Sequence, residues 1–217
     1  MASFTSAIEL GVDVIECDVH LTTDGRLAVI HDHTLERTTN GSGLVGRLSS
    51  AELTGLDAGK GERIPLLEEV LELARGRVGV AIEVKSLPIL YPGLEEVLVR
   101  VVRDAEMVED VAVISFDHRV VRRVRGLDDR ILGGVLLAGR PLLIPELLAF
   151  AGAEVYSPHW SYVDRETVHE VHAAGAAVGV WTVDDTMVLE QCQELGLDAV
   201  YTNRPREMLA ALGRATA

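Results

Sequence analysis

The chain has 217 residues, of which 48% are hydrophobic, 25% charged and 4% aromatic. A chain of this length buries roughly 70% of its unfolded surface, and its composition excludes the disordered, collagen-like and disulfide-scaffold classes. Its 34 acidic and 20 basic residues leave a formal charge of -14. That charge argues against general nucleic-acid binding, because an acidic surface repels phosphate backbones.

The sequence contains few features that indicate a cellular location or a binding partner. The two cysteines, Cys17 and Cys192, are too few for a disulfide framework and lack zinc-site spacing. No apolar run reaches the ~18 residues of a membrane span. No signal peptide is visible at Met1, which favours a cytoplasmic location, although an upstream signal would change this. The sequence leaves the oligomeric state open.

In chain order, β-branched runs alternate with amphipathic helical stretches. An apolar stripe of Phe4, Ala7 and Ile8 predicts a helix that starts almost at Met1. Further helices are expected around residues 66–75, 94–102, 166–174 and 187–195. Seven strands are expected at residues 14–21, 78–85, 111–115, 131–137, 155–157, 177–182 and 199–202.

Alternating strands and helices predict a parallel α/β sheet, either open and doubly wound or closed into a barrel. No G-x-G-x-x-G follows a predicted strand, and G-x-x-x-x-G-K-[ST] does not occur, so the usual signatures of nucleotide-binding open sheets are missing. Polar residues gather where strands end, which favours the barrel. We predict one domain, residues 1–217, with a TIM-type (β/α)8 barrel fold. Seven of its strands are present and its first strand is absent from this chain.

The strongest candidate site begins with Glu16 and Asp18. On a strand these carboxylates are two residues apart and share one face, while Cys17 and Val19 share the other. Paired carboxylates near a core repel each other, and a divalent cation such as Mg²⁺ or Ca²⁺ is their natural compensation. The neighbouring apolar residues make an exposed edge strand the less favoured interpretation.

A histidine is predicted beside the pair. Asp24-Gly25 is a two-residue hairpin signal, and a ladder that pairs Thr23 with Arg26 places Asp18 opposite His31. Directly opposed Cβ atoms lie ~4.5–5.5 Å apart. A register shifted by one residue would send His31 to the other face.

A later strand supplies the third group. Glu83 and Lys85 share one face of residues 78–85, and Glu83 joins Glu16 and Asp18 if the two strands are parallel neighbours. Lys85 adds a point charge suited to phosphate. Trp181 either fills the core or forms a substrate wall at a strand end.

These residues resemble the glycerophosphodiester phosphodiesterase family. The resemblance rests on an ordered set that spans essentially the whole chain: Gly11-Val12-Asp13-Val14-Ile15-Glu16-Cys17-Asp18-Val19, Thr22-x-Asp24-Gly25, His31-Asp32-x-x-Leu35-x-Arg37-Thr38-Thr39, Ile64-Pro65-x-Leu67-x-Glu69, Ile82-Glu83-Val84-Lys85, Ser115-Phe116-Asp117, Trp181-Thr182-Val183-Asp184 and Thr202-Asn203-Arg204-Pro205. Single pieces of the set are weak, but the order is highly specific.

The resemblance implies a hydrolase of lipid and glycerol metabolism that converts a glycerophosphodiester to glycerol 3-phosphate and an alcohol. It implies metal ligation by Glu16, Asp18 and Glu83, and an acid/base role for His31. It implies phosphate or glycerol contacts for Lys85 and Trp181. It also assigns residues 34–62 to a small insertion over the mouth of the barrel.

The chain departs from the family at its start. Members open with a strand ending in His-Arg-Gly and a Pro-Glu-Asn-Thr segment, and neither motif occurs before the first helix here. We favour a start assigned to an internal methionine over a real fragment, and on this hypothesis we expect low stability and weak or no activity from this chain. Two alternatives remain: an impaired barrel that binds metal or phosphodiester without turnover, and a lysophospholipid-cleaving phosphodiesterase. The short insertion favours a small polar substrate.

Overall fold

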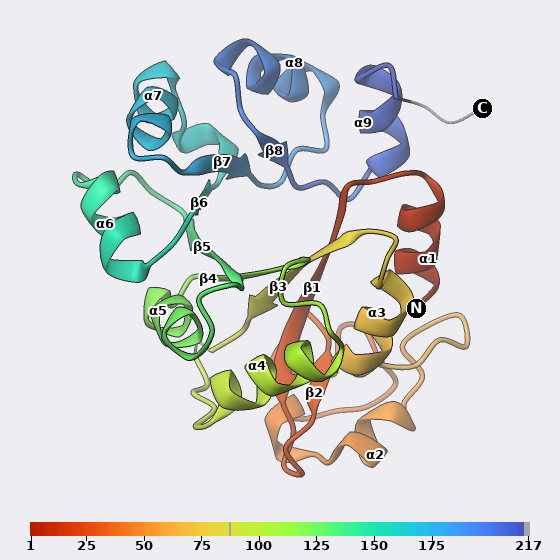
Figure 1. Cartoon of the computed structure of the whole chain (residues 1–217). Coiled ribbons are helices and arrows are strands. Elements are labelled where there is room, and N and C mark those ends of the chain that lie inside the picture. Colours follow the sequence, from red (N-terminus) through yellow and green to blue (C-terminus); the bar gives the residue numbers. More distant parts are fainter. Residues whose placement is uncertain (87, 215–217) are drawn as a thin grey trace.

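A curved, eight-stranded sheet forms the centre of the molecule, and the helices pack around it (Figure 1). The computed structural model describes residues 1–86 and 88–214. The strand order is β2-β1-β3-β4-β5-β6-β7-β8, with parallel pairing from β1 through β8 and antiparallel pairing of β2 with β1. The predicted TIM-type arrangement with seven parallel strands is therefore present, and β2 is the returning strand of the predicted hairpin.

The strands are β1 (Val14–Leu21), β2 (Leu27–Val29), β3 (Gly79–Val84), β4 (Val111–Ser115), β5 (Leu132–Leu137), β6 (Val155–Pro158), β7 (Ala177–Val180) and β8 (Ala199–Val200). The helices are α1 (Ala2–Glu9), α2 (Ser50–Thr54), α3 (Leu67–Ala74), α4 (Leu94–Asp104), α5 (His118–Leu127), α6 (Ile144–Ala151), α7 (Arg165–Ala173), α8 (Thr186–Leu195) and α9 (Pro205–Ala211). The 3-10 turns are η1 (Val45–Arg47) and η2 (Trp160–Tyr162).

Alternation along β1 divides its side chains between two environments. Ile15, Cys17 and Val19 point outward into an apolar layer shared with α3 and α4, where all three are buried. Cys17 is thus the buried thiol that its position in the strand predicts. Inside the barrel, Ala81, Ile114 and Leu136 form a small apolar floor from β3, β4 and β5. The site described below lies above this floor, towards the carboxyl ends of the strands.

The hairpin register differs by one residue from the predicted register. Leu21 pairs with Leu27 and Val19 pairs with Val29. The Thr22 amide donates to the Arg26 carbonyl, so three residues form the loop rather than two, and Gly25 takes the left-handed conformation that such loops require, with φ 76°. The sequence signal Asp24-Gly25 therefore located the turn correctly but misjudged its length.

The register places Ile30, rather than His31, against Asp18, through a 3.1 Å hydrogen bond from the Ile30 amide to the Asp18 carbonyl. His31 lies two residues beyond Val29, the last residue of β2. Beyond the end of a strand the backbone no longer alternates strictly, so the side of the sheet that His31 occupies is set by the loop rather than by the ladder.

The segment between β2 and α3 covers part of one end of the barrel. It contains η1 and α2, and the carboxylate of Asp24 anchors it to the hairpin by accepting hydrogen bonds from the Ser50 amide (2.9 Å) and hydroxyl (2.6 Å). At the other junction, Arg214 forms two hydrogen bonds with Asp13, at 2.6 and 2.8 Å. This ion pair links the end of the described chain to the turn before β1. Within the described residues, β8 pairs with β7 alone.

Packing between α4 and the sheet should dominate stability. Leu98 is fully buried, whereas Leu142 is 96% exposed. We expect Leu98→Ala to lower the free energy of unfolding by about 2–5 kcal/mol, because it removes buried methyl groups and leaves a cavity. The matched variant Leu142→Ala should change it by less than about 0.5 kcal/mol. Urea denaturation measures both, and equal effects would contradict this account of the core.

Candidate active site

Three carboxylates from two neighbouring strands meet at one end of the barrel. Glu16 and Asp18 lie on the inner face of β1, and the parallel register of β1 with β3 places Asp18 directly beside Glu83. One carboxylate oxygen from each of the three residues lies within 4.8 Å of the others. The predicted juxtaposition of the two strands is therefore present, and it brings Glu16, Asp18 and Glu83 into one cluster.

Lys85 is the cation beside this cluster. Its Nζ atom lies 2.9 Å from Oδ1 of Asp18 and 2.5 Å from Oε1 of Glu83. One lysine cannot neutralise three carboxylates, so the ionised cluster keeps two uncompensated negative charges. That deficit equals the charge of one divalent cation, and carboxylate oxygens are the ligands that Mg²⁺ and Ca²⁺ prefer.

The lack of positive charge in the cluster, together with burial, shifts the pKa values of its members. Burial, followed by repulsion from Asp18 and Glu83, raises the pKa of Glu16 to about 8. Burial also raises the pKa of Glu83, although the charge of Lys85 opposes the rise. The pKa of Lys85 is raised because the attraction of Asp18 and Glu83 outweighs its own burial. Without an added cation, the Glu16 carboxyl group therefore retains its proton near pH 7.

His31 reaches the same end of the barrel on the segment after β2. Its Nδ1 atom lies 2.6 Å from Oδ1 of Asp32. Arg37 holds this carboxylate from the other side with two hydrogen bonds, at 2.5 and 2.8 Å. These bonds, with those from Arg37 the larger cause, hold the pKa of Asp32 well below its usual range. The Asp32 carboxylate thus engages Nδ1 and leaves Nε2 of His31 available.

A cavity of about 720 Å³ is lined by two of the three carboxylates and by His31. Glu16, Asp18 and His31 line it together with residues of α1 and of the segment that precedes α3. Among the described residues that line this cavity, His31 is the only histidine. The one-residue error in the predicted register therefore did not remove His31 from the site.

His20 is a buried member of the site that the sequence analysis overlooked. Its Nε2 atom lies 3.3 Å from the carbonyl oxygen of His31, and its Nδ1 atom lies 3.0 Å from the hydroxyl of Tyr91. Because a carbonyl only accepts, Nε2 donates and Nδ1 accepts from Tyr91. Burial lowers the pKa of His20 to about 4, so the ring is neutral near pH 7. The alternation Glu16-x-Asp18-x-His20 was the available sequence signal for this residue.

Trp181 lies on another part of the mouth. Its indole Nε1–H donates a 2.9 Å hydrogen bond to the Ser157 carbonyl, and its ring packs on the apolar floor of the barrel. The rings of Phe116 and His159 contact it edge to face, with centroids at 5.4 and 5.2 Å. Trp181 is therefore part of an aromatic wall above the floor and does not line the cavity that holds His31.

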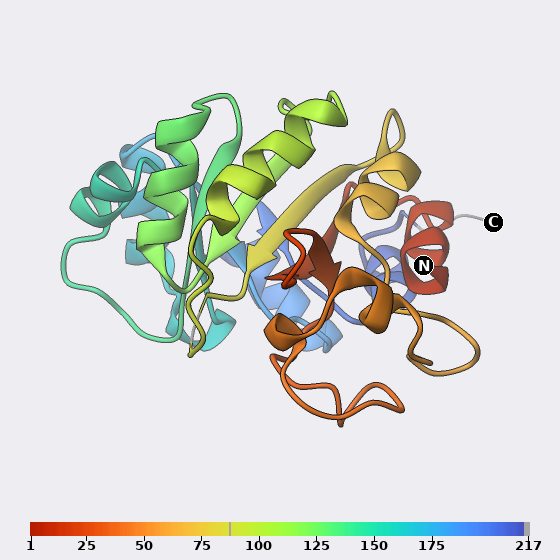
Figure 2. The same cartoon turned by 90° about the horizontal axis from the view of Figure 1, so that it is seen from below.

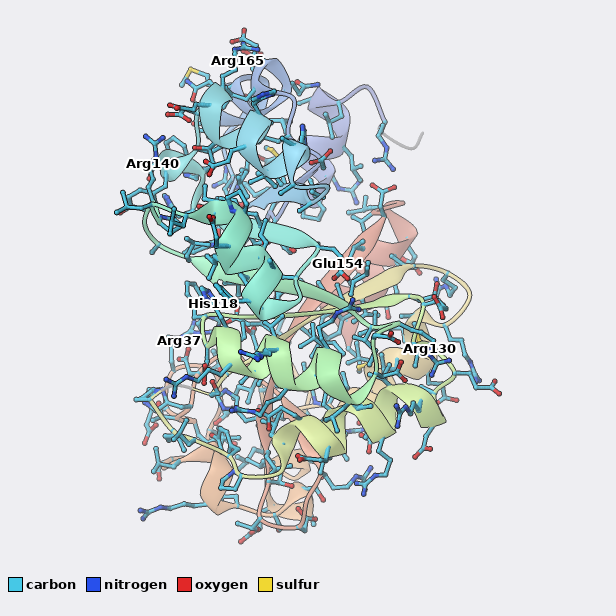
Figure 3. The ribbon with its side chains drawn as sticks, turned by 60° about the vertical axis from the view of Figure 1, so that its left-hand side comes forward. Arg37, His118, Arg130, Arg140, Glu154 and Arg165 are labelled. Carbon is cyan, nitrogen blue, oxygen red and sulfur yellow. The ribbon has the colours of Figure 1, made fainter. Side chains whose placement is uncertain are left out.

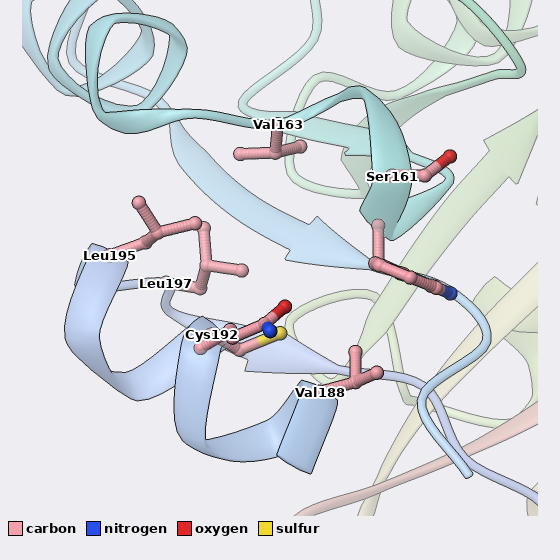
Figure 4. Close-up of a pocket in the computed structure, with 8 residues that line it drawn as sticks. Ser161, Val163, Val188, Cys192, Leu195 and Leu197 are labelled. Atoms are coloured by element: carbon pink, nitrogen blue, oxygen red, sulfur yellow. The ribbon is translucent and has the colours of Figure 1, made fainter. Parts of the chain in front are cut away.

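A second cavity, of about 170 Å³, lies between η2 and α8 (Figure 4). Its lining is mostly apolar: Trp160, Ser161, Val163, Val188, Gln191, Cys192, Leu195 and Leu197. Burial raises the pKa of the Cys192 thiol, which disfavours the reactive thiolate. This cavity gathers no acid/base pair, so the carboxylate cluster remains the candidate active site.

Comparisons with known proteins identify relatives of the whole chain. The model of the glycerophosphoryl diester phosphodiesterase family matches residues 1–207. A glycerophosphodiester phosphodiesterase of Caldanaerobacter subterraneus subsp. tengcongensis is 39% identical, over 96% of this chain and 89% of the relative. A glycerophosphodiester phosphodiesterase of Bacillus altitudinis is 35% identical, over 94% and 88%.

Solved structures show the same fold. A phosphodiesterase from Oleispira antarctica in complex with the product sn-glycerol-3-phosphate superposes with a TM-score of 0.87 at 28% identity, covering 98% of this chain and 90% of that one. A glycerophosphodiester phosphodiesterase from Agrobacterium tumefaciens superposes with a TM-score of 0.81 at 32% identity, covering 96% and 91%.

The raised pKa of Glu16 predicts a pH-dependent stability in the metal-free chain. Between its ordinary value of 4.5 and about 8, the folded chain binds a proton that the unfolded chain has released. The contribution of Glu16 to the free energy of unfolding in EDTA should therefore be largest below pH 4.5, and it should fall as the pH rises towards 8. Glu16→Gln should flatten this fall, although Glu83 contributes a remaining slope.

Urea titrations in EDTA at several pH values measure the effect. Glu72→Gln is the matched control, because Glu72 is an exposed carboxylate on α3. A Glu16→Gln variant whose stability falls with pH in parallel with the control would contradict the assignment of this slope to Glu16.

Proposed function

Because the chain belongs to the glycerophosphoryl diester phosphodiesterase family, we propose that it hydrolyses glycerophosphodiesters to glycerol 3-phosphate and an alcohol, with a divalent cation as cofactor. The observation that carries the proposal is the cluster of Glu16, Asp18 and Glu83 around one lysine. The match over residues 1–207 includes every residue of this cluster. The product bound in the Oleispira antarctica structure, sn-glycerol-3-phosphate, is the product expected of this reaction.

The cluster is suited to hold Mg²⁺ or Ca²⁺. Its donors are all oxygens, its ionised form lacks two positive charges, and the pKa of Glu16 is raised as expected for a carboxylate without a counter-ion. A bound cation would neutralise the charge that builds on the non-bridging phosphate oxygens. Glu16, Asp18 and Glu83 would hold it, and Lys85 would contribute a second positive charge at the phosphate.

His31 supplies the proton transfer in this proposal. The ring donates Nδ1–H to Asp32, so the free Nε2 is the atom that accepts a proton from the attacking oxygen. That oxygen belongs either to water or to the neighbouring hydroxyl of the glycerol. A new bond forms between it and phosphorus, the bond from phosphorus to the alcohol oxygen breaks, and one proton in all passes from the attacking oxygen to the alcohol that leaves. Attack by water gives glycerol 3-phosphate directly, whereas attack by the hydroxyl gives a cyclic phosphate that water then opens to glycerol 3-phosphate.

The remaining contacts orient the substrate. Trp181, held by its bond to the Ser157 carbonyl, offers an apolar face to the carbon side of the glycerol. His20 holds the backbone of His31 in place by donating a hydrogen bond to the carbonyl oxygen of His31. The Tyr91 hydroxyl holds His20 in turn by donating a hydrogen bond to its Nδ1 atom. Residues 34–62 limit the mouth on one side, which supports the interpretation of this segment as an insertion within a single domain.

Loss of the third carboxylate tests the cation site. We expect Glu83→Gln to lower kcat/KM on glycerophosphocholine by at least about a hundredfold, because the variant leaves fewer charged ligands for the cation. EDTA should abolish the activity of the unchanged chain, and Mg²⁺ or Ca²⁺ should restore it. A coupled assay that follows the release of glycerol 3-phosphate measures the activity.

Glu72→Gln should retain full activity in the same assay, because its carboxylate is on the surface of α3. Turnover that persists in EDTA would refute the cation-dependent reaction. Binding of the cation without any release of glycerol 3-phosphate would instead identify a barrel that holds its ligands but does not cleave them.

The pair of His31 and Asp32 gives a separate test. His31→Ala should lower kcat by about 10²–10⁴-fold, the usual contribution of a general acid or base. Asp32→Asn should cause a smaller loss in kcat and should leave KM nearly unchanged, because Asp32 orients the ring and does not reach the phosphate. Steady-state kinetics distinguishes the two, and a change confined to KM in Asp32→Asn would contradict the orienting role.

A further inference from the structure

The interior of the barrel has a charged side and an aromatic side. The carboxylate cluster and Lys85 belong to β1, to β3 and to the segment directly after β3. Trp181 and Tyr201 follow β7 and β8, and both rings pack on the apolar floor. Figure 1 shows β7 and β8, in blue, across the curve of the sheet from β1 and β3, and the same blue segment lies behind these strands in Figure 2. Tyr201 is therefore an interior side chain for which the proposed reaction has not yet needed a role.

Alternation along the last strands explains why the Tyr201 ring points inward. Gly179 of β7 is the register partner of Ala199, and a Cβ atom added to Gly179 would lie 3.5 Å from the Cβ atom of Ala199. The same added atom would lie 3.3 Å from Cε2 of Tyr201 and 3.7 Å from Oγ of Ser157. Tyr201 continues the inward face two residues after Ala199. The missing side chain of Gly179 thus leaves room for the Tyr201 ring beside Ser157.

Ser157 has a hydroxyl group whose hydrogen-bonding capacity is unused. The residue is fully buried, and its Oγ atom has no hydrogen-bond partner among the described residues. A buried polar group without a partner is costly and calls for an explanation. Burial raises the pKa of Tyr201, and the Ser157 hydroxyl opposes this rise, which is the effect of an O–H group directed towards the phenol oxygen. Ser157 is therefore suited to donate to Tyr201.

The carboxylate cluster acts on the same phenol. After burial and the opposing effect of Ser157, the negative charges of Glu16 and Glu83 raise the pKa of Tyr201 further. The phenol therefore lies close enough to the cluster to be influenced by its charge, and it keeps its proton near pH 7. A neutral O–H group suits a neutral oxygen of the substrate, whereas the phosphate is better matched by a cation and by Lys85.

The preceding residue of β6 carries a similar hydroxyl on the opposite face. Tyr156 is fully buried against α6 and α7, and its hydroxyl also has no hydrogen-bond partner in the described part of the chain. Burial raises the pKa of Tyr156 to about 12, and the charge of Arg140 opposes the rise. Figure 3 shows Arg140 at the outer edge of the molecule. Tyr156 is thus a buried phenol that faces away from the interior of the barrel.

We propose that the Tyr201 hydroxyl donates a hydrogen bond to the terminal hydroxyl of the substrate's glycerol group, and that Ser157 orients the Tyr201 hydroxyl from behind. The inference rests on the proposed function, which supplies the glycerophosphodiester and places Trp181 beside its carbon atoms. The Ser157 carbonyl accepts the 2.9 Å hydrogen bond from Trp181, so Ser157 supports both aromatic side chains.

The two ends of the glycerol group are then recognised by different sides of the barrel. The phosphate lies at the charged side, and the hydroxyl next to the phosphate ester lies towards His31. The terminal hydroxyl extends past Trp181 to Tyr201. The substrate class is therefore a phosphodiester of glycerol whose terminal hydroxyl is free.

Kinetics on two esters tests this contact. 2-Hydroxypropyl phosphocholine differs from glycerophosphocholine only by the absence of the terminal hydroxyl. We expect kcat/KM of the unchanged chain to be at least about tenfold higher on glycerophosphocholine, because a site that bonds a hydroxyl discriminates against the analogue without it. Tyr201→Phe should remove this preference by lowering kcat/KM on glycerophosphocholine alone. Ser157→Ala should reduce the preference by a smaller factor, and choline release measures both reactions.

Tyr156→Phe is the matched control. It removes a buried phenol hydroxyl from the adjacent position of β6, and the preference for glycerophosphocholine should remain that of the unchanged chain. Tyr201→Phe retains the ring on the apolar floor, so its thermal unfolding should match that of the control.

Binding distinguishes the contact from the reaction. In the presence of Mg²⁺, calorimetry should show that the unchanged chain binds glycerol 3-phosphate about tenfold more tightly than 2-hydroxypropyl phosphate, and that Tyr201→Phe binds the two equally. Absence of choline release from both esters would overturn the proposed function, and the binding preference would still decide the role of Tyr201.

Three results would overturn that role. The first is an unchanged chain that does not discriminate between the two esters and the two phosphates. The second is an equal loss on both esters in Tyr201→Phe, which would show that the hydroxyl only supports the fold. The third is a loss of preference in Tyr156→Phe as large as that in Tyr201→Phe, which would show a general effect of removing a buried hydroxyl.

Discussion

The imbalance between three carboxylates and one lysine is the constraint on which the site depends. Glu16, Asp18 and Glu83 are held close together by the pairing of β1 with β3, and strand pairing leaves them little freedom to separate. Lys85 satisfies part of their charge, and burial raises the pKa of Glu16 to about 8. The cluster thus creates a negative potential that a bound divalent cation would relieve.

The rest of the mouth is organised around that potential. His31 lines the same cavity as Glu16 and Asp18. Its ring is oriented by Asp32, whose carboxylate also accepts a hydrogen bond from Arg37. His20 provides a neutral buried link between the backbone of His31 and the loop that carries Tyr91. On the far side, Trp181 is fixed by a backbone carbonyl and packed on the apolar floor. Polar and apolar groups therefore lie at the same end of the barrel.

The sequence by itself determined the succession of strands and helices, because buried parallel strands read as apolar runs and helices as stripes. It also determined that Glu16 shares a face with Asp18 and that Glu83 shares one with Lys85, since side chains alternate along any strand. Only the tertiary structure decided the three-residue hairpin loop, because Asp24-Gly25 fits loops of either length. The partnership of His20 with Tyr91, 71 residues away, also required the pairing of β1 with β3, because periodicity along a chain carries no information about which distant loops meet.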